Sequence, residues 1–395
     1  MDPIYLGNSK IAKKHQVTRF VHIETIDLDI KQAGGVESLV RDTLDFGDLD
    51  WQLIGVTRNP KQKNLGQNRS YSTSTNKVIP WVAVSSFRVK KFTPDSFRLC
   101  IGLLRHSSAL SGKKTFLAHR VEVGLLLRMM KVNFILVLHN NSTGLLAKSS
   151  ESLWRRVPKL FNLTSRFACK GAKAIVVFNS TEAEKLKAWN ENTFSMMSWF
   201  DSSVFYLPDR GSSLTRKFNS PIQLTWIGRL ESQKNPILAL KIAENLAGAG
   251  IEVKLDVIGS GSLLRQVELY VSENNLGSVV TLHGLKNREY VAEELRKSDC
   301  LLVTSYSEGS SLVIAEAAAL GVPTIVHEAA DTDSFIVDGV NGFRAQTHEP
   351  QNYVQKILKL NSISRQEVEL HSRSRSRDKL LPEFEAIISR FAIPS

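Results

Sequence analysis

The sequence predicts two successive α/β domains, each with a mainly parallel sheet. Three observations predict this class. Short apolar, β-branched runs typical of buried strands alternate with amphipathic stretches typical of helices. This alternation restarts after about residue 205. With 395 residues, the chain also exceeds the size at which a single hydrophobic core stops growing.

The first half opens with a strand, a glycine turn and a helix, followed by a second strand. These elements are FVHIETIDLDI (20–30), QAGGVESLVRDTL (32–44) and WQLIGVT (51–57). A later helix is predicted to have Thr93 as its cap and Pro94 in its first turn. Two further runs have the composition of buried parallel strands: NFILVL (133–138) and AIVVF (174–178).

The second half repeats the pattern with more regular spacing. Its predicted strands are IQLTWIG (222–228), VKLDVIG (253–259), VVTLHG (279–284), CLLVTS (300–305) and PTIVH (323–327). Helical stretches lie between them, for example 235–250 and 288–298. The polar segment 206–221, which contains Pro and Gly, is the predicted linker. We therefore expect domains at 1–205 and 206–375, and a final amphipathic helix within 376–395.

Composition excludes several classes of protein. Apolar residues make up 42% and charged residues 23% of the chain, which is ordinary for a globular protein. The three cysteines are far apart and odd in number, which favours a reducing compartment over a disulfide framework. No Cys or His spacing indicates zinc, the start has no signal-peptide core, and the most apolar stretch is interrupted by Arg128 and Lys131. We expect a cytoplasmic protein without a membrane span.

The net charge of +12 is unevenly distributed. Residues 51–200 contain 24 Lys and Arg against 6 Asp and Glu, whereas residues 201–350 contain 13 against 19. Only the first domain is therefore expected to face a polyanion or an anionic membrane. A separate Ser-Arg run, HSRSRSRDKL (371–380), is interpreted as a solvated helix face or linker in preference to a nucleic-acid arm.

Ligands of open parallel sheets lie at the carboxyl ends of the strands, so motifs in the loops there carry the most weight. In SEGSSLVIAEAAALGVP (307–323), Glu308 lies in a loop and Glu316 inside a helix predicted from near Ser310 to Leu320. Carboxylates so placed could hold hydroxyl pairs at two ends of one extended ligand, with free helix amides meeting an anion between them. The alternative from spacing alone is an exposed pair of glutamates.

Two more strand-end motifs precede this one. WIGRLESQKNP (226–236) places Arg229 and Lys234 before a helix, an arrangement suited to phosphate oxygens, although surface charge would give the same pattern. VIGSGS (257–262) has a glycine pair after a strand, for which a tight turn is the simpler interpretation.

In this order, the motifs resemble the donor domain of the family-4 retaining glycosyltransferases of the GT-B fold (glycosyl transferases group 1). The resemblance covers about residues 221–345 through GRLESQKNP, VIGSGS, LHGLKNREYVAEELRKSD, SEGSSLVIAEAAALGVP and DGVNGFRA. It extends more faintly to the first half through GGVESLVRDTL, VLHNN, VVFNSTEAEKL and FDSSVF. The resemblance implies two Rossmann-like domains facing across a cleft, with the C-terminal helix crossing back to the first domain.

The resemblance also implies roles in the second domain. Glu308 would hold hydroxyls of the transferred sugar, and Glu316 would hold the ribose hydroxyls of the nucleotide. Arg229 and Lys234 would bind the diphosphate. The backbone amides expected to help them belong to Gly309, Ser310, Ser311 and Leu312.

The remaining implied residues line the nucleoside pocket or belong to the first domain. Gly259 and the backbone of Gly284 and Leu285 would line that pocket. Gly35 would let the diphosphate and the acceptor approach the backbone, and His139 would face the reacting sugar. His139 also has a simpler interpretation, a hydrogen-bonded histidine in the cleft wall, and His119 is a second, weaker candidate for the same role.

The resemblance departs from the family pattern at two places. Ser334 stands where the family usually has a glutamate, so contacts near the sugar are expected to differ. FDSSVF (200–205) lacks the usual Asn and Gly before it. The expected reaction is metal-independent transfer of a sugar from a nucleotide diphosphate sugar, UDP- or GDP-linked, to an acceptor hydroxyl with retention of configuration. The nucleotide sugar is a co-substrate, and no cofactor or metal is expected.

The acceptor is expected on the basic first half. Segments such as SFRVKKF (86–92) and LWRRVPKLFNLTSRFACK (153–170) mix cations with Phe and Trp, which favours a glycan or lipid-linked acceptor at an anionic membrane surface, and synthesis of cell-envelope polysaccharide or glycolipid. The alternative is a solvated face. Two rival classes are a non-catalytic nucleotide-sugar-binding partner subunit and a nucleic-acid-binding protein, for which no module is recognisable.

Overall fold

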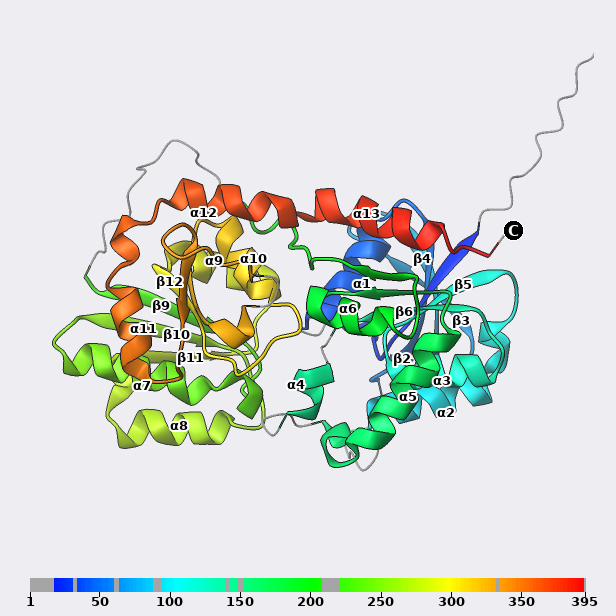
Figure 1. The fold of residues 1–395 in the computed structure, drawn as a ribbon, viewed down its shortest axis with the longest axis horizontal. Helices are drawn as coiled ribbons and strands as arrows, with labels where there is room; N and C mark the ends of the chain where they lie inside the picture. Colours follow the sequence, from blue (N-terminus) through cyan, green and yellow to red (C-terminus); the bar gives the residue numbers. More distant parts are fainter. Residues whose placement is uncertain are drawn as a thin grey trace, which may run out of the picture.

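The structure is a computed structural model and describes residues 18–30, 34–59, 64–87, 94–139, 142–147, 152–207, 220–331 and 334–393. Two sheets carry the fold, and each is covered by helices on both faces (Figure 1). The sequence prediction of two α/β domains with mainly parallel sheets is confirmed. The predicted linker 206–221 lies mostly outside the described residues, as does the predicted cap Thr93.

The first sheet has the strand order β3-β4-β2-β1-β5-β6-β7-β8. Its neighbouring strands are parallel except β3 and β4, which are antiparallel. The central strands are buried on both faces, because helices cover both sides of the sheet. The strands are β1 (Arg19–Ile23), β2 (Asp50–Thr57), β3 (Asn68–Ser72), β4 (Val78–Ser86), β5 (Lys114–Ala118), β6 (Phe134–Leu138), β7 (Ala174–Val177) and β8 (Thr193–Ser195).

The second sheet has the order β11-β10-β9-β12-β13-β14, with all neighbours parallel. Its first strand in the chain, β9, lies at the centre, so the loops after β9, β10 and β12 meet at one edge. The strands are β9 (Ile222–Ile227), β10 (Val253–Ile258), β11 (Val280–Gly284), β12 (Cys300–Val303), β13 (Thr324–His327) and β14 (Gly342–Ala345).

Helices connect the strands and cover the sheets. Those of the first half are α1 (Gly35–Phe46), α2 (Asp95–Arg105), α3 (Val121–Met129), α4 (Ser142–Leu146), α5 (Pro158–Gly171) and α6 (Ser180–Lys187). Those of the second half are α7 (Pro236–Gly248), α8 (Leu264–Glu273), α9 (Arg288–Lys297), α10 (Leu312–Ala319), α11 (Pro350–Ile357), α12 (Arg365–Ser372) and α13 (Arg377–Ser389). Short 3-10 helices include η2 (Leu153–Arg156), η3 (Ser232–Lys234), η5 (Glu328–Ala330) and η8 (Arg373–Arg375).

The two faces of the first sheet have separate apolar cores. One core joins the sheet to α2, α3 and α5 through side chains such as Leu103, Leu127 and Cys169. The other joins it to α1 and to α13, which contributes Phe384 and Ile388. The C-terminal helix therefore crosses back to the first domain, as expected. In Figure 1, α12 runs along the top of the second domain and α13 continues along the top of the first.

The interpretation of the Ser-Arg run 371–380 as a solvated helix face or linker is wrong for two of its arginines, whereas Arg373 and Lys379 are exposed. Arg375 and Arg377 are buried. The Arg375 guanidinium lies 4.2 Å from the Phe335 ring centroid, and Arg377 lies 3.5 Å from that of Phe46. Arg377 also donates to Asp201 at 2.5 Å. Tertiary partners that are distant in sequence turn this charged segment inward, where the chain passes between the domains.

Among the described residues, no helix combines the length and apolar character needed to cross a membrane.

Candidate active site

Lys234 and Glu308 form the best-defined ion pair at the carboxyl edge of the second sheet. Lys234 ends η3 after β9, and Glu308 lies in the loop after β12. The Lys234 ammonium contacts both oxygens of Glu308, at 2.7 and 2.6 Å. Ser305 donates to the same carboxylate at 2.5 Å. The structure thus places in direct contact two residues that the sequence assigned to different parts of a donor, and the carboxylate is buried.

The helix after Glu308 is shorter than predicted. It begins at Leu312, because Ser311 has non-helical backbone angles, and it ends at Ala319. Glu316 consequently lies in the second turn, with its side chain buried beneath the loop. The Ser311 hydroxyl is buried and has no hydrogen-bond partner among the described residues. The loop edge therefore combines a buried carboxylate with an unpartnered polar group.

Burial, the main cause, raises the pKa of Glu316 to about 7. Asp42 and Asp201 raise it further, while Arg288 opposes them. Arg288 begins α9 and donates to Asp42 of α1 at 3.0 Å, and it lies 3.5 Å from Asp201. Glu316 therefore lies beside a cluster of charges contributed by both domains. Sequence reasoning missed Arg288, Asp42 and Asp201, since pairings across 246 positions leave no local signal.

The loop that contains Glu308 also contacts the first domain. Asn179 donates from its side chain to the Gly309 carbonyl at 3.3 Å, and Ser310 is hydrogen-bonded to Ser198. Asn179 also caps the start of α6, because its side-chain oxygen accepts a hydrogen bond from the Glu182 amide. The predicted residues Gly309 to Leu312 therefore lie at the junction of the domains.

The predicted glycines of the nucleoside pocket have clear structural reasons. A Cβ on Gly259 would lie 1.8 Å from the Gly228 carbonyl oxygen, so the loops after β9 and β10 can approach only with glycine there. The Gly259 amide donates to Gly284 at 2.9 Å, which joins two of the predicted residues. Leu285 is exposed, and the space beside Gly284 is open. The close approach confirms the tight packing of this turn, and pocket lining stays a prediction.

Arg229 lies apart from the Lys234–Glu308 pair. Its guanidinium is mostly exposed and pairs with Glu231 at 2.7 Å. The side chain is long enough to reorient, but the structure does not bring it to Lys234.

In the first domain, His139 follows β6 and is the end of a hydrogen-bonded chain of imidazoles. His139 Nε2 lies 2.8 Å from His119 Nδ1, and His119 Nε2 lies 2.8 Å from His22 Nδ1. The chain ends at the Thr43 hydroxyl, 2.7 Å from His22 Nε2. His139 also stacks on Phe178. The sequence proposed His139 and His119 as alternatives, and the structure joins them.

The direction of this chain follows from Thr43. Its hydroxyl donates to the Val40 carbonyl at 2.7 Å, so the oxygen must accept from His22 Nε2–H. Each imidazole then accepts through one nitrogen and donates through the other, so the Nδ1 atom of His139 carries a lone pair, to which no donor among the described residues is assigned. Burial and the neighbouring His119 lower the pKa of His139 to about 3, so these rings are neutral at physiological pH.

An ion pair with a buried carboxylate adjoins these histidines. Glu24, just after β1, accepts from Arg120 at 2.7 Å and from the Thr25 amide at 2.6 Å. Burial acts to raise its pKa, but Arg120, His119 and Thr25 together lower the pKa to about 2.

Gly35 begins α1 nearby in the chain, and a Cβ there would meet no atom within 4 Å. The space beside Gly35 is therefore open, as a ligand approaching the backbone requires.

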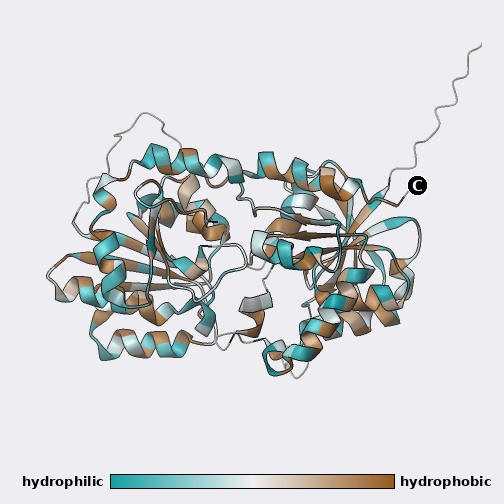
Figure 2. Ribbon diagram, in the orientation of Figure 1, coloured by the Kyte–Doolittle hydropathy of each residue, from teal (hydrophilic) through white to brown (hydrophobic). Residues whose placement is uncertain are grey.

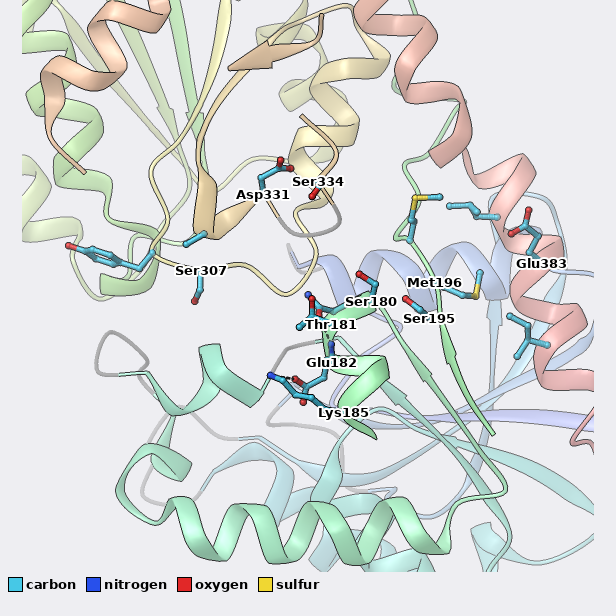
Figure 3. Close-up of a pocket in the computed structure, with 16 residues that line it drawn as sticks. Ser180, Thr181, Glu182, Lys185, Ser195, Met196, Ser307, Asp331, Ser334 and Glu383 are labelled. Carbon is cyan, nitrogen blue, oxygen red and sulfur yellow. Dashed lines mark hydrogen bonds and ion pairs between the residues drawn. The ribbon is translucent and has the colours of Figure 1, made fainter. Parts of the chain in front are cut away.

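A cavity of about 780 Å³ lies between the domains and is also lined by α13 (Figure 3). Its lining includes Ser180 and Thr181 at the start of α6, Ser307 beside Glu308, and Asp331 and Ser334. The structure describes all thirteen site residues predicted from the sequence, and none of them is among the residues that line this cavity. The sequence missed this cavity because five separate segments form it.

One group of described residues has the geometry of a metal site. Asp256, His283 and Glu294 offer ligand atoms within 4.8 Å of one another on β10, β11 and α9. His283 already uses both ring nitrogens, with Asp256 at 2.7 Å and the Tyr290 hydroxyl at 2.8 Å. The cluster is therefore satisfied internally.

The architecture is similar to that of solved glycosyltransferases with the GT-B fold. Sucrose-phosphate synthase from Thermosynechococcus elongatus superposes with a TM-score of 0.78 at 14% identity, over 95% of this chain and 99% of that structure. Anabaena HepE in complex with UDP and glucose gives 0.68 at 14% identity, over 94% and 100%. At these identities, the similarity shows the fold.

Within this fold, residues 214–377 match the model of the family "Glycosyl transferases group 1". An uncharacterized glycosyltransferase of Methanocaldococcus jannaschii is 36% identical over 110 residues, 28% of this chain and 31% of the relative. The D-inositol 3-phosphate glycosyltransferase of Mycolicibacterium smegmatis is 26% identical over 195 residues, 47% and 44% of the two chains. The matched segments span less than half the length of these relatives. Lys234, Glu308 and Glu316 lie within the segment that matches the family model.

Proposed function

We propose that the protein is a glycosyltransferase that moves a sugar from a nucleotide diphosphate sugar to an acceptor hydroxyl. The observation that supports this most is the partly buried Lys234–Glu308 ion pair, which lies with the buried Glu316 in the segment that matches group 1 glycosyltransferases. HepE, a protein of the same fold, binds UDP and glucose. The donor here is UDP- or GDP-linked, and transfer proceeds with retention and without a metal, as the family resemblance implies.

Binding of the donor separates the ion pair. The diphosphate is a stronger partner for the Lys234 ammonium than one carboxylate, and its arrival frees Glu308 to accept hydrogen bonds from sugar hydroxyls. The amides at the start of α10 face the same anion, and Arg229 reorients from Glu231 to join them. Glu316 holds the ribose hydroxyls, with its position fixed by burial within α10.

The chemical step breaks the bond between the sugar C1 and a diphosphate oxygen and forms a bond from C1 to the acceptor oxygen. The acceptor proton passes to the departing phosphate oxygen on the same face, which keeps the configuration at C1. Lys234 and the α10 amides stabilise the negative charge that develops on the leaving group. The bare Nδ1 of His139 accepts a hydrogen bond from a sugar hydroxyl and fixes the ring of the donor.

The cavity between the domains is the proposed acceptor site. Its polar lining from α6 and the segment around Asp331 suits hydroxyl groups, and it opens beside Ser307 in the donor loop (Figure 3). A glycan or lipid-linked acceptor fits this location, consistent with a cytoplasmic enzyme of cell-envelope polysaccharide or glycolipid synthesis that works at the inner face of the membrane.

Substitution of Lys234 tests the proposal. Lys234→Ala should lower transfer at least about a hundredfold, because one preorganised donor to the leaving group is lost. The matched control is Lys241→Ala, an exposed lysine on α7. A thermal-shift panel of UDP-, GDP- and ADP-sugars identifies the donor first, since the cognate donor stabilises the folded protein by mass action.

Two results would count against this function. Full turnover by the Lys234→Ala variant would remove the ammonium from the mechanism. A wild-type protein that is stabilised by one nucleotide sugar but neither transfers nor slowly hydrolyses it would be the non-catalytic partner subunit.

A further inference from the structure

The outer surface of three helices of the first domain exposes an unusual number of large apolar side chains. Helices α2, α3 and α5 form one layer, with α3 packed between the other two, and together they cover one face of the first sheet (Figure 1). Figure 2 shows apolar and hydrophilic residues mixed along these helices. The exposed apolar residues of this layer and of η2 are Phe97, Ile101, Leu104, Met129, Leu153, Val157, Leu160, Leu163 and Phe167.

Their spacing places them on continuous stripes. On α5, Leu160, Leu163 and Phe167 recur at helical spacing, and the opposite face of that helix is buried through Phe161 and Ala168. α2 repeats this with Phe97, Ile101 and Leu104 outward. Both helices therefore have two apolar faces, and only one of them is used by the core. One exposed leucine, such as Leu163 at 65% exposure, is common on a protein surface. A row of exposed apolar side chains is not explained by packing among the residues that the structure describes.

The charge of the same surface has one sign. Residues 94–105, 121–132 and 152–173 contain ten Lys and Arg and only two acids, Asp95 and Glu122. Glu122 is bonded within the layer, to Ser96 at 3.1 Å and to Trp154 at 2.9 Å. The stretch 152–173, which includes η2 and α5, contains no acid. The ten cations are Arg98, Arg105, Arg128, Lys131, Arg155, Arg156, Lys159, Arg166, Lys170 and Lys173.

We propose that the outer face of α2, α3, α5 and η2 docks on the surface of an anionic lipid bilayer, with α5 lying in the plane of the interface. Apolar side chains on the outer face enter the acyl boundary, while Lys and Arg at the margins reach the anionic head groups. A protein partner would be expected to offer acids in matched positions. A bilayer matches this face more simply. The leucine and phenylalanine side chains can enter the acyl region, while the neighbouring lysines and arginines bind the anionic head groups.

The docked face adjoins the proposed acceptor cavity. α4 and η2 pack on α5 through Leu145, Trp154 and Phe161. Ser142 at the start of α4 donates to Glu182 at 3.0 Å, and Glu182 lines the cavity. An enzyme seated on this face holds its cavity close to the head groups. The docking itself requires no substrate, so it is tested independently of the proposed transfer reaction.

Vesicle co-sedimentation of the full chain tests the proposal. Wild-type protein should pellet with vesicles that contain phosphatidylglycerol, and far less with pure phosphatidylcholine. High ionic strength should weaken the interaction. Leu163→Glu and Phe167→Glu should each reduce binding at least about tenfold, because an apolar side chain that would be buried in the bilayer is replaced by a charge. Lys159→Glu and Arg166→Glu leave the apolar side chains in place and test the electrostatic contribution. Each should reduce binding about fivefold per unit of charge changed.

Matched variants outside the face control for nonspecific effects. Leu269→Glu on α8 replaces an exposed helical leucine outside the face, and Lys241→Glu on α7 replaces an exposed lysine, so both variants should bind like wild type. Thermal unfolding of every variant checks that the fold is retained.

Three results would overturn the proposal. The first is wild-type protein that stays in the supernatant with anionic vesicles. The second is Leu163→Glu that pellets as well as wild type. The third is that neither protein binds vesicles, while wild type self-associates in gel filtration and the Leu163→Glu variant is a monomer. That result would assign the face to a second copy of the chain.

Discussion

Single side chains at the candidate site are held by partners from distant parts of the chain. Glu316 shares its surroundings with Arg288, Asp42 and Asp201, and of these four residues the sequence suggested a role only for Glu316. The same holds for His139, whose free nitrogen is set by the hydrogen bond that Thr43 makes at the other end of the imidazole chain. The chemistry of a recognisable residue is thus tuned by residues that no local pattern identifies.

Glu316→Gln should stabilise the protein at high pH and impair its activity. The folded-state pKa of Glu316 is raised to about 7 from 4.5, so ionisation opposes folding. Below pH 4.5 the carboxyl is neutral in both states and the variant gains nothing. The penalty in wild type grows from pH 4.5 to 7 and is complete above 7, where it is on the order of 3 kcal/mol. Chemical denaturation at pH 4 and pH 8 measures the difference.

The control for this prediction is Glu328→Gln, an exposed glutamate in η5. A gain of stability in Glu316→Gln that is equal at both pH values would contradict the electrostatic explanation. A variant that is stabilised at pH 8 but transfers sugar at the wild-type rate would contradict the ribose-binding role.

At the scale of elements, the loops that follow β9 and β10 approach each other closely, and they contain the residues proposed to bind the diphosphate and the nucleoside. The Gly228 amide donates to Ile258, and the Leu230 amide donates to Ser260, so the two loops run side by side through backbone hydrogen bonds. No room is left for a side chain on Gly259. The sequence motif VIGSGS indicated a tight turn, and the structure shows that the constraint comes from a second loop.

Gly259→Ala should destabilise the second domain by about 3 kcal/mol or more, because the added carbon meets a backbone oxygen and the backbone angle φ of 146° is unfavourable for alanine. Gly248→Ala, at the end of α7 where no atom lies within 4 Å, should instead stabilise the protein by about 0.4–1 kcal/mol. Urea unfolding of both variants provides the measurement. Equal stabilities would show that the loops separate at little cost.

At the scale of the whole molecule, the last helix joins the two domains into one structure. α13 places Phe384 between Trp51 and Trp199, with ring centroids 6.5 and 5.8 Å away. The neighbouring Glu385 accepts from the Trp51 indole at 2.8 Å and from the amides of Asp48 and Leu49. Residues more than 330 positions downstream therefore complete the core of the first domain.

Phe384→Ala should lower the stability of the first domain by about 3–5 kcal/mol, since a fully buried ring is replaced by a cavity. Tryptophan fluorescence in urea reports it, because Trp51 and Trp199 flank the site. Leu370→Ala on α12, an exposed leucine, should change stability by less than about 0.5 kcal/mol. A first domain that unfolds at the same urea concentration in both variants would mean that α13 is only loosely attached.

The sequence by itself determined the two parallel-sheet domains, the amphipathic last helix, and the positions of Lys234, Glu308 and Glu316 in or after strand-end loops. It could do so because strand burial, helix periodicity and strand-end loops are encoded over short stretches of chain. The tertiary structure alone decided the inward turn of Arg375 and Arg377, the charge cluster around Arg288, the histidine chain and the cavity between the domains. Each of these depends on contacts between residues far apart in sequence, where partner and burial are set by packing and not by local composition.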